Sequence, residues 1–183
     1  MALTYSSMLD LETNLIKFDL LNSLNSQMFS SDSIDKRKFT LIMFICNHCP
    51  YVIHYHNEIK RLSDDFLQEI NMIAISSNDI DNYPQDSPEK MKYLWDSLGL
   101  SFPYLFDETQ EIAKKYKAEC TPEFYLFNLK QKLVYRGRMD QSSPGSNIQP
   151  SGEDLRQAIN NLFEDKPISK KQFPSMGCNI KWK

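Results

Sequence analysis

Residues 39–52 read Phe-Thr-Leu-Ile-Met-Phe-Ile-Cys-Asn-His-Cys-Pro-Tyr-Val and join an apolar run to the start of an amphipathic pattern. The nearly continuous apolar run over 39–45 predicts a central strand that is buried on both faces. Pro50 suits the first position of a helix, where its missing N–H costs nothing. The next apolar side chains recur at helical spacing: Tyr51, Tyr55, Ile59, Leu62 and Phe66. The stretch therefore predicts a strand-to-helix junction that contains two cysteines.

Strands and helices are expected to alternate along the rest of the chain. The alternation around 16–20 and the short stretch 27–29 predict an N-terminal β-hairpin before the junction. The later elements are a strand over 71–77, a helix from Ser87 to Gly99, a helix opened by a capping box at Asp107 and Gln110, an antiparallel hairpin of 124–127 with 133–135, and a helix from about Ser151. Residues 166–183 show no periodicity and are expected to form an irregular tail. The order predicts a single α/β domain over 1–183, a mixed β-sheet with helices on both faces.

Composition excludes several functions. The 183 residues carry a net charge of −3 with no basic stripe, so nucleic acid is not an expected partner. The five glycines never stand at the spacing of a dinucleotide or phosphate loop. Neither a secretory signal nor a run long enough for a membrane span is visible, which predicts a cytoplasmic protein without a membrane partner. Four cysteines in that compartment are expected to be reduced and in part chemically active rather than structural disulfides.

Cys46 and Cys49 form the strongest chemical motif. A C-x-x-C beside a strand–helix–strand pattern predicts a redox site. Cys49 directly precedes Pro50 and is expected at the helix N-cap, where unpaired N–H groups and the helix dipole stabilise a thiolate. Cys46 is expected at the strand end, within disulfide reach of Cys49. His48 is either a modulator that lowers the thiol pKa or an exposed loop residue, and a pair of inert buried thiols is the alternative to the redox site.

Residues 44–52 resemble the CNHCPYV-type, peroxiredoxin-like branch of the thioredoxin superfamily, which is related to alkyl hydroperoxide reductase and thiol-specific antioxidant proteins. Residues 120–127, Cys-Thr-Pro-Glu-Phe-Tyr-Leu-Phe, and the closing residues 174–183 share the resemblance, which runs from about Leu15 to the end of the chain. It implies a thioredoxin-like fold, thiol redox chemistry and an antioxidant activity, with no cofactor.

The resemblance also implies a role for each residue of the motif. Cys49 falls on the nucleophile and Cys46 becomes its resolving partner. Thr121 and Pro122 match the Thr-Pro pair of thioredoxins, in which a cis-Pro lies opposite the active cysteine and the backbone before it binds the substrate peptide. These residues are therefore the expected substrate-binding pair.

The same resemblance departs from true peroxiredoxins at two positions. Cys46 stands in place of the peroxiredoxin Thr, and Pro122 stands near the place of its Arg. Arg136 or Arg138, on or just after the next strand, would have to reach back to Cys49 to replace that Arg. Peroxide reduction is therefore expected to be slow.

The remaining candidates are weaker. Cys120 is either a second resolving thiol or a core residue, and Cys178 is expected mainly to pack the tail onto the domain. His54 and His56 are two positions apart on a helix and do not share a face, so no metal site is predicted.

The sequence predicts a thiol-disulfide oxidoreductase-like protein that works by dithiol–disulfide exchange. Its partners would be a protein or small-molecule disulfide, or a peroxide, together with an upstream thiol reductant. Two alternatives stay open: a thiol-dependent peroxidase in which Cys49 is oxidised to a sulfenic acid, and a non-catalytic redox or metal-binding module.

Overall fold

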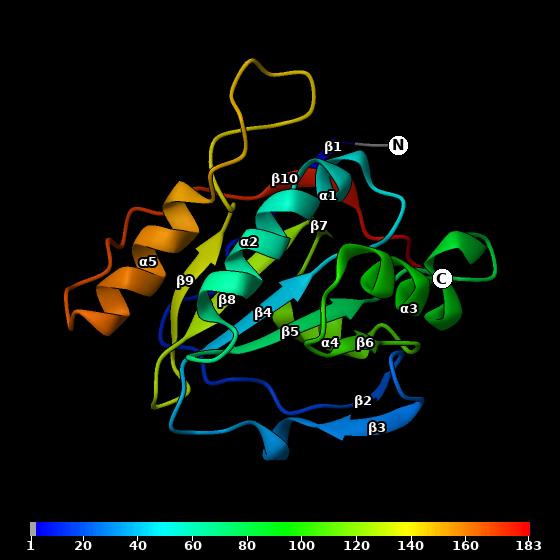
Figure 1. The fold of residues 1–183 in the computed structure, drawn as a ribbon, viewed down its shortest axis with the longest axis horizontal. Helices are drawn as coiled ribbons and strands as arrows, with labels where there is room; N and C mark the ends of the chain where they lie inside the picture. The colour runs from blue at the N-terminus through cyan, green and yellow to red at the C-terminus, as the bar shows by residue number, and fades with distance from the viewer. Residues whose placement is uncertain (1–2) are drawn as a thin grey trace.

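The computed structural model describes residues 3–183 (Figure 1). The strands are β1 (Leu3–Tyr5), β2 (Asp19–Asn22), β3 (Gln27–Ser30), β4 (Thr40–Phe44), β5 (Asn71–Ser76), β6 (Tyr104–Phe106), β7 (Cys120–Thr121), β8 (Glu123–Phe127), β9 (Leu133–Gly137) and β10 (Met176–Asn179). The helices are α1 (Pro50–His54), α2 (His56–Phe66), α3 (Pro88–Leu98), α4 (Glu111–Tyr116) and α5 (Glu153–Phe163), with 3-10 turns at Ser31–Ser33 and Pro84–Asp86. Within residues 3–183, no helix combines the length and apolarity needed to cross a membrane.

A seven-stranded mixed sheet forms the centre, in the order β3-β2-β6-β5-β4-β8-β9. Strand β4 is parallel to β5, and β5 is parallel to β6. The hairpin partners β8 and β9 extend the sheet antiparallel beyond β4, and β2 pairs antiparallel with β6 on the other side. The N-terminal hairpin of β2 with β3 forms as predicted. The mixed α/β sheet expected from the order of elements is therefore confirmed.

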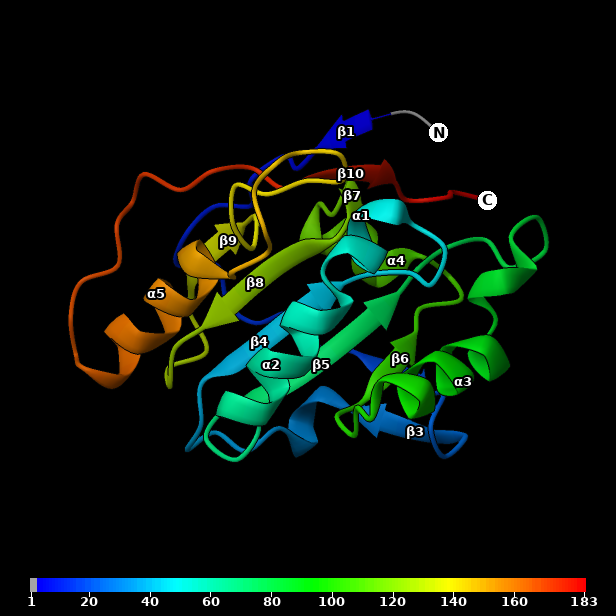
Figure 2. The ribbon, with the colours of Figure 1, turned by 45° about the horizontal axis from the view of Figure 1, so that its top comes forward.

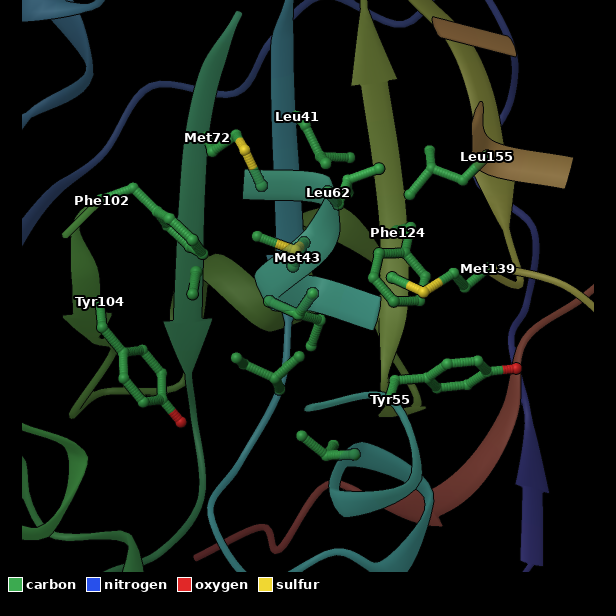
Figure 3. Close-up of a cluster of buried hydrophobic side chains, with 14 of the residues drawn as sticks. Leu41, Met43, Tyr55, Leu62, Met72, Phe102, Tyr104, Phe124, Met139 and Leu155 are labelled. Atoms are coloured by element: carbon green, nitrogen blue, oxygen red, sulfur yellow. The ribbon is translucent and has the colours of Figure 1, made fainter. Parts of the chain in front are cut away.

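The molecule has one hydrophobic cluster on each face of the sheet. Strand β4 contributes side chains to both clusters, because its side chains alternate between the two faces. Leu41 and Met43 belong to the cluster covered by α2, α3 and α5 (Figure 3). Ile42 and Phe44 belong to the opposite cluster, which α4 and the N-terminal segment cover. All five β4 residues are buried. The apolar run thus behaves as predicted, as a central strand buried on both faces.

The helix expected from Pro50 to Phe66 is two helices. Tyr55 separates α1 from α2, with φ −97° and ψ 2°. Its hydroxyl donates to the Asp140 carboxylate at 2.8 Å and contacts the Ser142 carbonyl at 2.9 Å. The side chain is therefore held by the loop after β9, and the break leaves the predicted apolar face in place.

The predicted helix start at Asp107, in a capping box with Gln110, is wrong. Helix α4 begins at Glu111, with Gln110 as N-cap in a left-handed conformation, φ 63°. The Asp107 carboxylate instead accepts from the Ala113 N–H at 2.9 Å, inside the helix, and from the Ser77 hydroxyl at 2.8 Å. Asp107 still satisfies a helix N–H, but from a turn that precedes the helix.

The tail expected to be irregular contains strand β10, which lies between β1 and β7 in a second, three-stranded sheet (Figure 2). The register pairs Cys178 with Thr121 and Leu3 with Cys178. Gly177 permits this approach, because a Cβ there would lie 2.0 Å from the Thr121 carbonyl oxygen. A four-residue strand that pairs only with distant segments leaves no local periodicity to detect.

Candidate functional site

The junction after β4 positions both cysteines of the C-x-x-C. Cys49 is the N-cap of α1, with φ −72° and ψ 122°, and Pro50 is the first helical residue. Cys46 lies two residues beyond the end of β4. Both side chains are buried, and Cys49 has no exposed surface. The predicted backbone placement of the motif is therefore confirmed.

Thr121 contacts both of these sulfurs from β7. Its hydroxyl oxygen is 3.4 Å from the Cys46 sulfur, and its carbonyl oxygen is 3.2 Å from the Cys49 sulfur. The peptide bond between Thr121 and Pro122 is cis, as the resemblance implied. The structure thus brings Thr121 to Cys46 and Cys49, although more than 70 positions separate it from either cysteine.

Cys178 joins this group from strand β10. Its sulfur lies 2.8 Å from the sulfur of Cys49, although 129 positions separate the two residues. The sequence favoured a packing role for Cys178 over a chemical one. The structure instead places it in direct contact with the expected nucleophile.

The environment of Cys49 favours its thiolate. The pKa of Cys49 is lowered to about 5, first by a hydrogen bond from the Cys46 thiol and further by hydrogen bonds from Cys178 and Thr121. Burial acts in the opposite direction, and the backbone N–H of Val52 in the first turn of α1 adds a smaller stabilisation. A pKa near 5 favours the thiolate form of this buried sulfur at neutral pH.

The other three cysteines keep their protons. The pKa of Cys46 is raised well above its usual value by its hydrogen bond to Cys49 and by burial. Burial, followed by the hydrogen bond to Cys49 and the charge of that residue, raises the pKa of Cys178 to about 12. Burial also raises the pKa of Cys120, whose sulfur lies 3.9 Å from the Glu123 carboxylate. Cys49 is thus the one cysteine of the four whose pKa is lowered.

Asp86 fixes the loop between the two cysteines. Its carboxylate accepts from the Asn47 backbone N–H at 2.8 Å, from the Asn78 side chain at 2.7 Å and contacts His48 Nδ1 at 2.7 Å. The His48 ring also stacks on Tyr83, with 5.5 Å between ring centroids. Asp86 is fully buried. Nothing in the sequence singled it out, because it lies at the end of a polar loop almost 40 positions from Asn47 and His48.

One group of side chains offers ligand atoms for a metal. Cys46, His48 and Asp86 place such atoms within 4.8 Å of one another. The 2.7 Å between His48 Nδ1 and the Asp86 carboxylate is a hydrogen-bond distance, and the two atoms point at each other. This arrangement already uses both groups as partners of one another, so a bound ion would have to separate them.

The remaining predicted residues lie in other contacts. His54 Nε2 is 2.9 Å from the Ser142 hydroxyl, and burial lowers the pKa of His56. Arg136 donates to the Leu9 carbonyl at 2.6 Å and to Gln172 at 2.9 Å. Arg138 donates to Asp154 at 2.6 Å, and its guanidinium lies 4.3 Å from the centre of the Phe173 ring. Both arginines are thus held by partners other than Cys49.

Comparison with known structures places the fold. The chain is similar to an uncharacterised conserved protein from Geobacillus kaustophilus, with 45% identity, a TM-score of 0.97 and coverage of 100% of this chain and 97% of that one. A hypothetical protein from Sinorhizobium meliloti is 34% identical over 98% of each chain, with a TM-score of 0.94. The thioredoxin domain of a thiol-disulfide oxidoreductase from Bacteroides vulgatus shares 13% identity, with a TM-score of 0.64 over 84% of this chain and 98% of that domain. These likenesses show a thioredoxin-like fold.

Comparison with sequences gives the family. A search among curated proteins found no match. Residues 11–150 match the family described as Redoxin, and this range covers most of the chain and includes Cys46, Cys49, Thr121 and Pro122. The protein therefore belongs to the Redoxin family.

Proposed function

We propose that this Redoxin-family protein is a thiol-disulfide oxidoreductase in which Cys49 attacks a disulfide and Cys46 resolves the product. The single observation that carries the proposal is the position of Cys49, a buried thiol at the N-cap of α1 in a C-x-x-C. This environment lowers its pKa to about 5, first through the hydrogen bond from Cys46. A thiolate is the nucleophile in thiol–disulfide exchange, and a neighbouring thiol is what the second step requires.

The reaction proceeds in two exchanges. The Cys49 thiolate attacks one sulfur of the substrate disulfide, a mixed disulfide forms, and the other substrate sulfur leaves as a thiolate. Cys46 then attacks the sulfur of Cys49, so that the Cys46–Cys49 bond forms and the second substrate thiolate leaves. The substrate gains two electrons, the protein loses them, and an upstream thiol reductant returns them.

Cys46 becomes easier to ionise when it is needed. Its pKa is raised first by the hydrogen bond to the Cys49 thiolate, and the Cys49 charge adds to this. Both effects disappear once Cys49 is bonded to the substrate sulfur, because the negative charge is then gone. The change favours attack by Cys46 at the mixed-disulfide stage.

Thr121 and Pro122 remain the proposed substrate-binding pair, with a constraint on access. Strand β10 already pairs with Thr121, and Cys49 has no exposed surface. A substrate segment that paired with Thr121 would have to displace β10, whereas a small disulfide needs a smaller opening. We place this activity in the cytoplasm, where thiol systems supply the reductant.

The test is turnover of a protein disulfide, insulin, with dithiothreitol as reductant. Cys49→Ser should lower the rate to that of the uncatalysed reaction. Cys46→Ser should trap the mixed disulfide or slow its resolution. Cys120→Ser is the matched control, because its sulfur faces Glu123, and it should keep the wild-type rate. Turnover that survives in Cys49→Ser would contradict the proposal.

A further inference from the structure

We propose that Cys178 is a third redox thiol of this site and forms a disulfide with Cys49, which locks strand β10 over the nucleophile. The inference rests on the proposed function, because it requires Cys49 to be the reacting thiolate. Its starting point is the pair of sulfurs that lie 2.8 Å apart. A disulfide bond is about 2.05 Å long, so the two sulfurs need to approach by less than about 1 Å.

The backbone holds Cys178 in this position. Strand β10 pairs with β1 on one side and with β7 on the other, and Cys178 lies opposite Thr121. The Thr121 carbonyl oxygen is itself 3.2 Å from the Cys49 sulfur. Gly177 lets the two backbones come this close, since any Cβ there would collide with Thr121. Cys178 is thus delivered to Cys49 by a paired strand rather than by a loose tail.

The exchange needs no oxidant beyond the proposed reaction. In the oxidised protein, the Cys178 thiolate attacks the sulfur of Cys49 in the Cys46–Cys49 disulfide. The Cys49–Cys178 bond forms, the Cys46–Cys49 bond breaks, and Cys46 leaves as a thiolate that takes up the proton released by Cys178. The protein keeps one disulfide throughout, so no electrons are gained or lost.

Oxidation of Cys49 also removes two of the effects that keep Cys178 protonated. Burial is the largest cause of its raised pKa, and the hydrogen bond to the Cys49 thiolate and the charge of that residue follow. The latter two vanish when Cys49 is in a disulfide, whereas the charge of Lys181 continues to favour the Cys178 thiolate. Cys178 is therefore activated at the stage at which it would attack.

The consequence is that the Cys49–Cys178 disulfide would block access to the site. Strand β10 contacts the fully buried Cys49 through Cys178 and occupies the pairing edge of Thr121. With the Cys49–Cys178 bond in place, the strand cannot leave until a reductant breaks that bond. Reduction would thus be required before any substrate segment could pair with Thr121.

The experiment uses the full chain with Cys46→Ser and Cys120→Ser combined, so that Cys49 and Cys178 are the two remaining cysteines. One equivalent of dipyridyl disulfide, a small reagent that stays reactive toward low-pKa thiols in mild acid, is added at pH 6. Attack by Cys49 releases one pyridine thione, and resolution by Cys178 releases a second. We expect two thiones per reagent molecule and a protein mass that shows an internal disulfide without an adduct. With Cys178→Ala added, we expect one thione and a stable pyridyl adduct on Cys49.

Each other outcome has a defined meaning. One thione and a stable adduct in the variant that retains Cys178 would overturn the role of Cys178 and leave the proposed function standing. No thione release would overturn the proposed function itself, because Cys49 would then not be the reactive thiol. Peptide mapping of the oxidised wild-type protein is a second measurement that does not depend on variants. A Cys49–Cys178 peptide is expected there, and a map with Cys46–Cys49 as the only disulfide contradicts the inference.

Discussion

Cys46 and Cys49 share a hydrogen bond but differ in ionisation, because only one negative charge fits between them. The proton stays on Cys46, whose pKa is raised, and the charge stays on Cys49, whose pKa is lowered to about 5. Cys178 and the Val52 N–H favour the charge on Cys49, whereas the Thr121 side chain lowers the pKa of both cysteines. This asymmetry supports the proposed roles, attack by Cys49 and resolution by Cys46.

The pH profile of alkylation tests this assignment. A group with a pKa near 5 is protonated below that pH, so the rate of Cys49 alkylation by iodoacetamide should rise through pH 5 and level off above it. Cys46→Ala removes the largest stabilising donor, and burial then raises the midpoint by more than about 1 pH unit. Cys46→Ser keeps an O–H donor and should shift the midpoint less. Equal shifts in both variants would show that the hydrogen bond is not the cause.

Peroxide reduction should be slow. The thiolate lacks the arginine donor of a peroxiredoxin, because Arg136 and Arg138 are held by Leu9 and Asp154. By analogy with oxyanion holes, one missing donor costs about 10²–10³ in rate. Stopped-flow oxidation of the reduced protein by hydrogen peroxide should give a rate near that of an ordinary thiolate, unchanged in Arg136→Ala and Arg138→Ala. A rate several orders of magnitude higher that either substitution abolishes would favour the peroxidase.

Local spacing in the sequence predicted the part of this site that lies in one short segment. The contacts that Cys178 and Asp86 make from distant positions in the sequence were not predicted. Cys46, Cys49 and Pro50 fall within five positions, so a strand followed by a helix fixes their relative places. Cys178 is 129 positions from Cys49, and no local pattern reports such a contact. Asp86 was missed for the same reason, since an acidic residue that ends a polar loop has no pattern of its own.

At the scale of elements, strand β10 is the element that we expect to restrict access to Cys49. It is four residues long and held on both edges, by β1 and β7. The close approach depends on Gly177, where an added Cβ would lie 2.0 Å from the Thr121 carbonyl oxygen. Backbone atoms cannot rotate away as a flexible side chain does, so a substitution must push the strand itself outward.

Gly177→Ala should therefore open the site. We expect a stability loss of about 1–3 kcal/mol from the overpacked strand pair and faster labelling of Cys49 by a bulky maleimide relative to iodoacetamide. Urea unfolding and the ratio of the two labelling rates measure these effects. Gly145→Ala is the control for the labelling ratio, because a Cβ there meets nothing within 4 Å, although its φ of +79° makes this substitution cost stability of its own. An unchanged ratio in Gly177→Ala would show that β10 does not restrict access.

The elements with a strong pattern of their own were predictable. Strands β4 and β5, helix α3 with its Gly99 stop at φ 64°, and the hairpin of β8 with β9 agree with the sequence interpretation. The short strands β1, β6 and β10 were not expected, because three or four residues hold too little periodicity. The break at Tyr55 was missed, because the local pattern around it is helical and its side-chain partner, Asp140, is 85 positions away.

At the scale of the whole molecule, strands from the two ends of the described chain pair with each other, and one of them, β10, contacts Cys49 through Cys178. Strands β1 and β10 pair antiparallel above α1, so the C-terminal segment returns across the domain to the N-terminal one (Figure 2). A Cys49–Cys178 bond would close a loop over most of the chain, whereas a Cys46–Cys49 bond closes a loop of a few residues. The two disulfides therefore differ in their effect on stability.

This difference is measurable by thermal unfolding. Closing a loop of 129 residues lowers the entropy of the unfolded chain and so raises the free energy of unfolding by about 5 kcal/mol. The short loop between Cys46 and Cys49 raises it by less than about 2 kcal/mol. The melting temperature of the oxidised variant with Cys46→Ser and Cys120→Ser should thus be higher than that of its reduced form, by at most about 10–20 °C. The variant that also carries Cys178→Ala should melt at the same temperature with and without reductant. Equal melting of the oxidised and reduced double variant would mean that the long loop is not closed.

The central claim is that Cys49 alone is the reactive thiolate, and the identity of the first thiol to be alkylated tests it most directly. The reduced wild-type protein would be treated with less than one equivalent of iodoacetamide at pH 6.5 and mapped by mass spectrometry. Because the pKa of Cys49 is about 5 and that of Cys178 is about 12, nearly all of the label should be on Cys49. Label found mainly on Cys46, Cys120 or Cys178, or no reaction below about pH 8, where an ordinary thiol begins to ionise, would contradict the account.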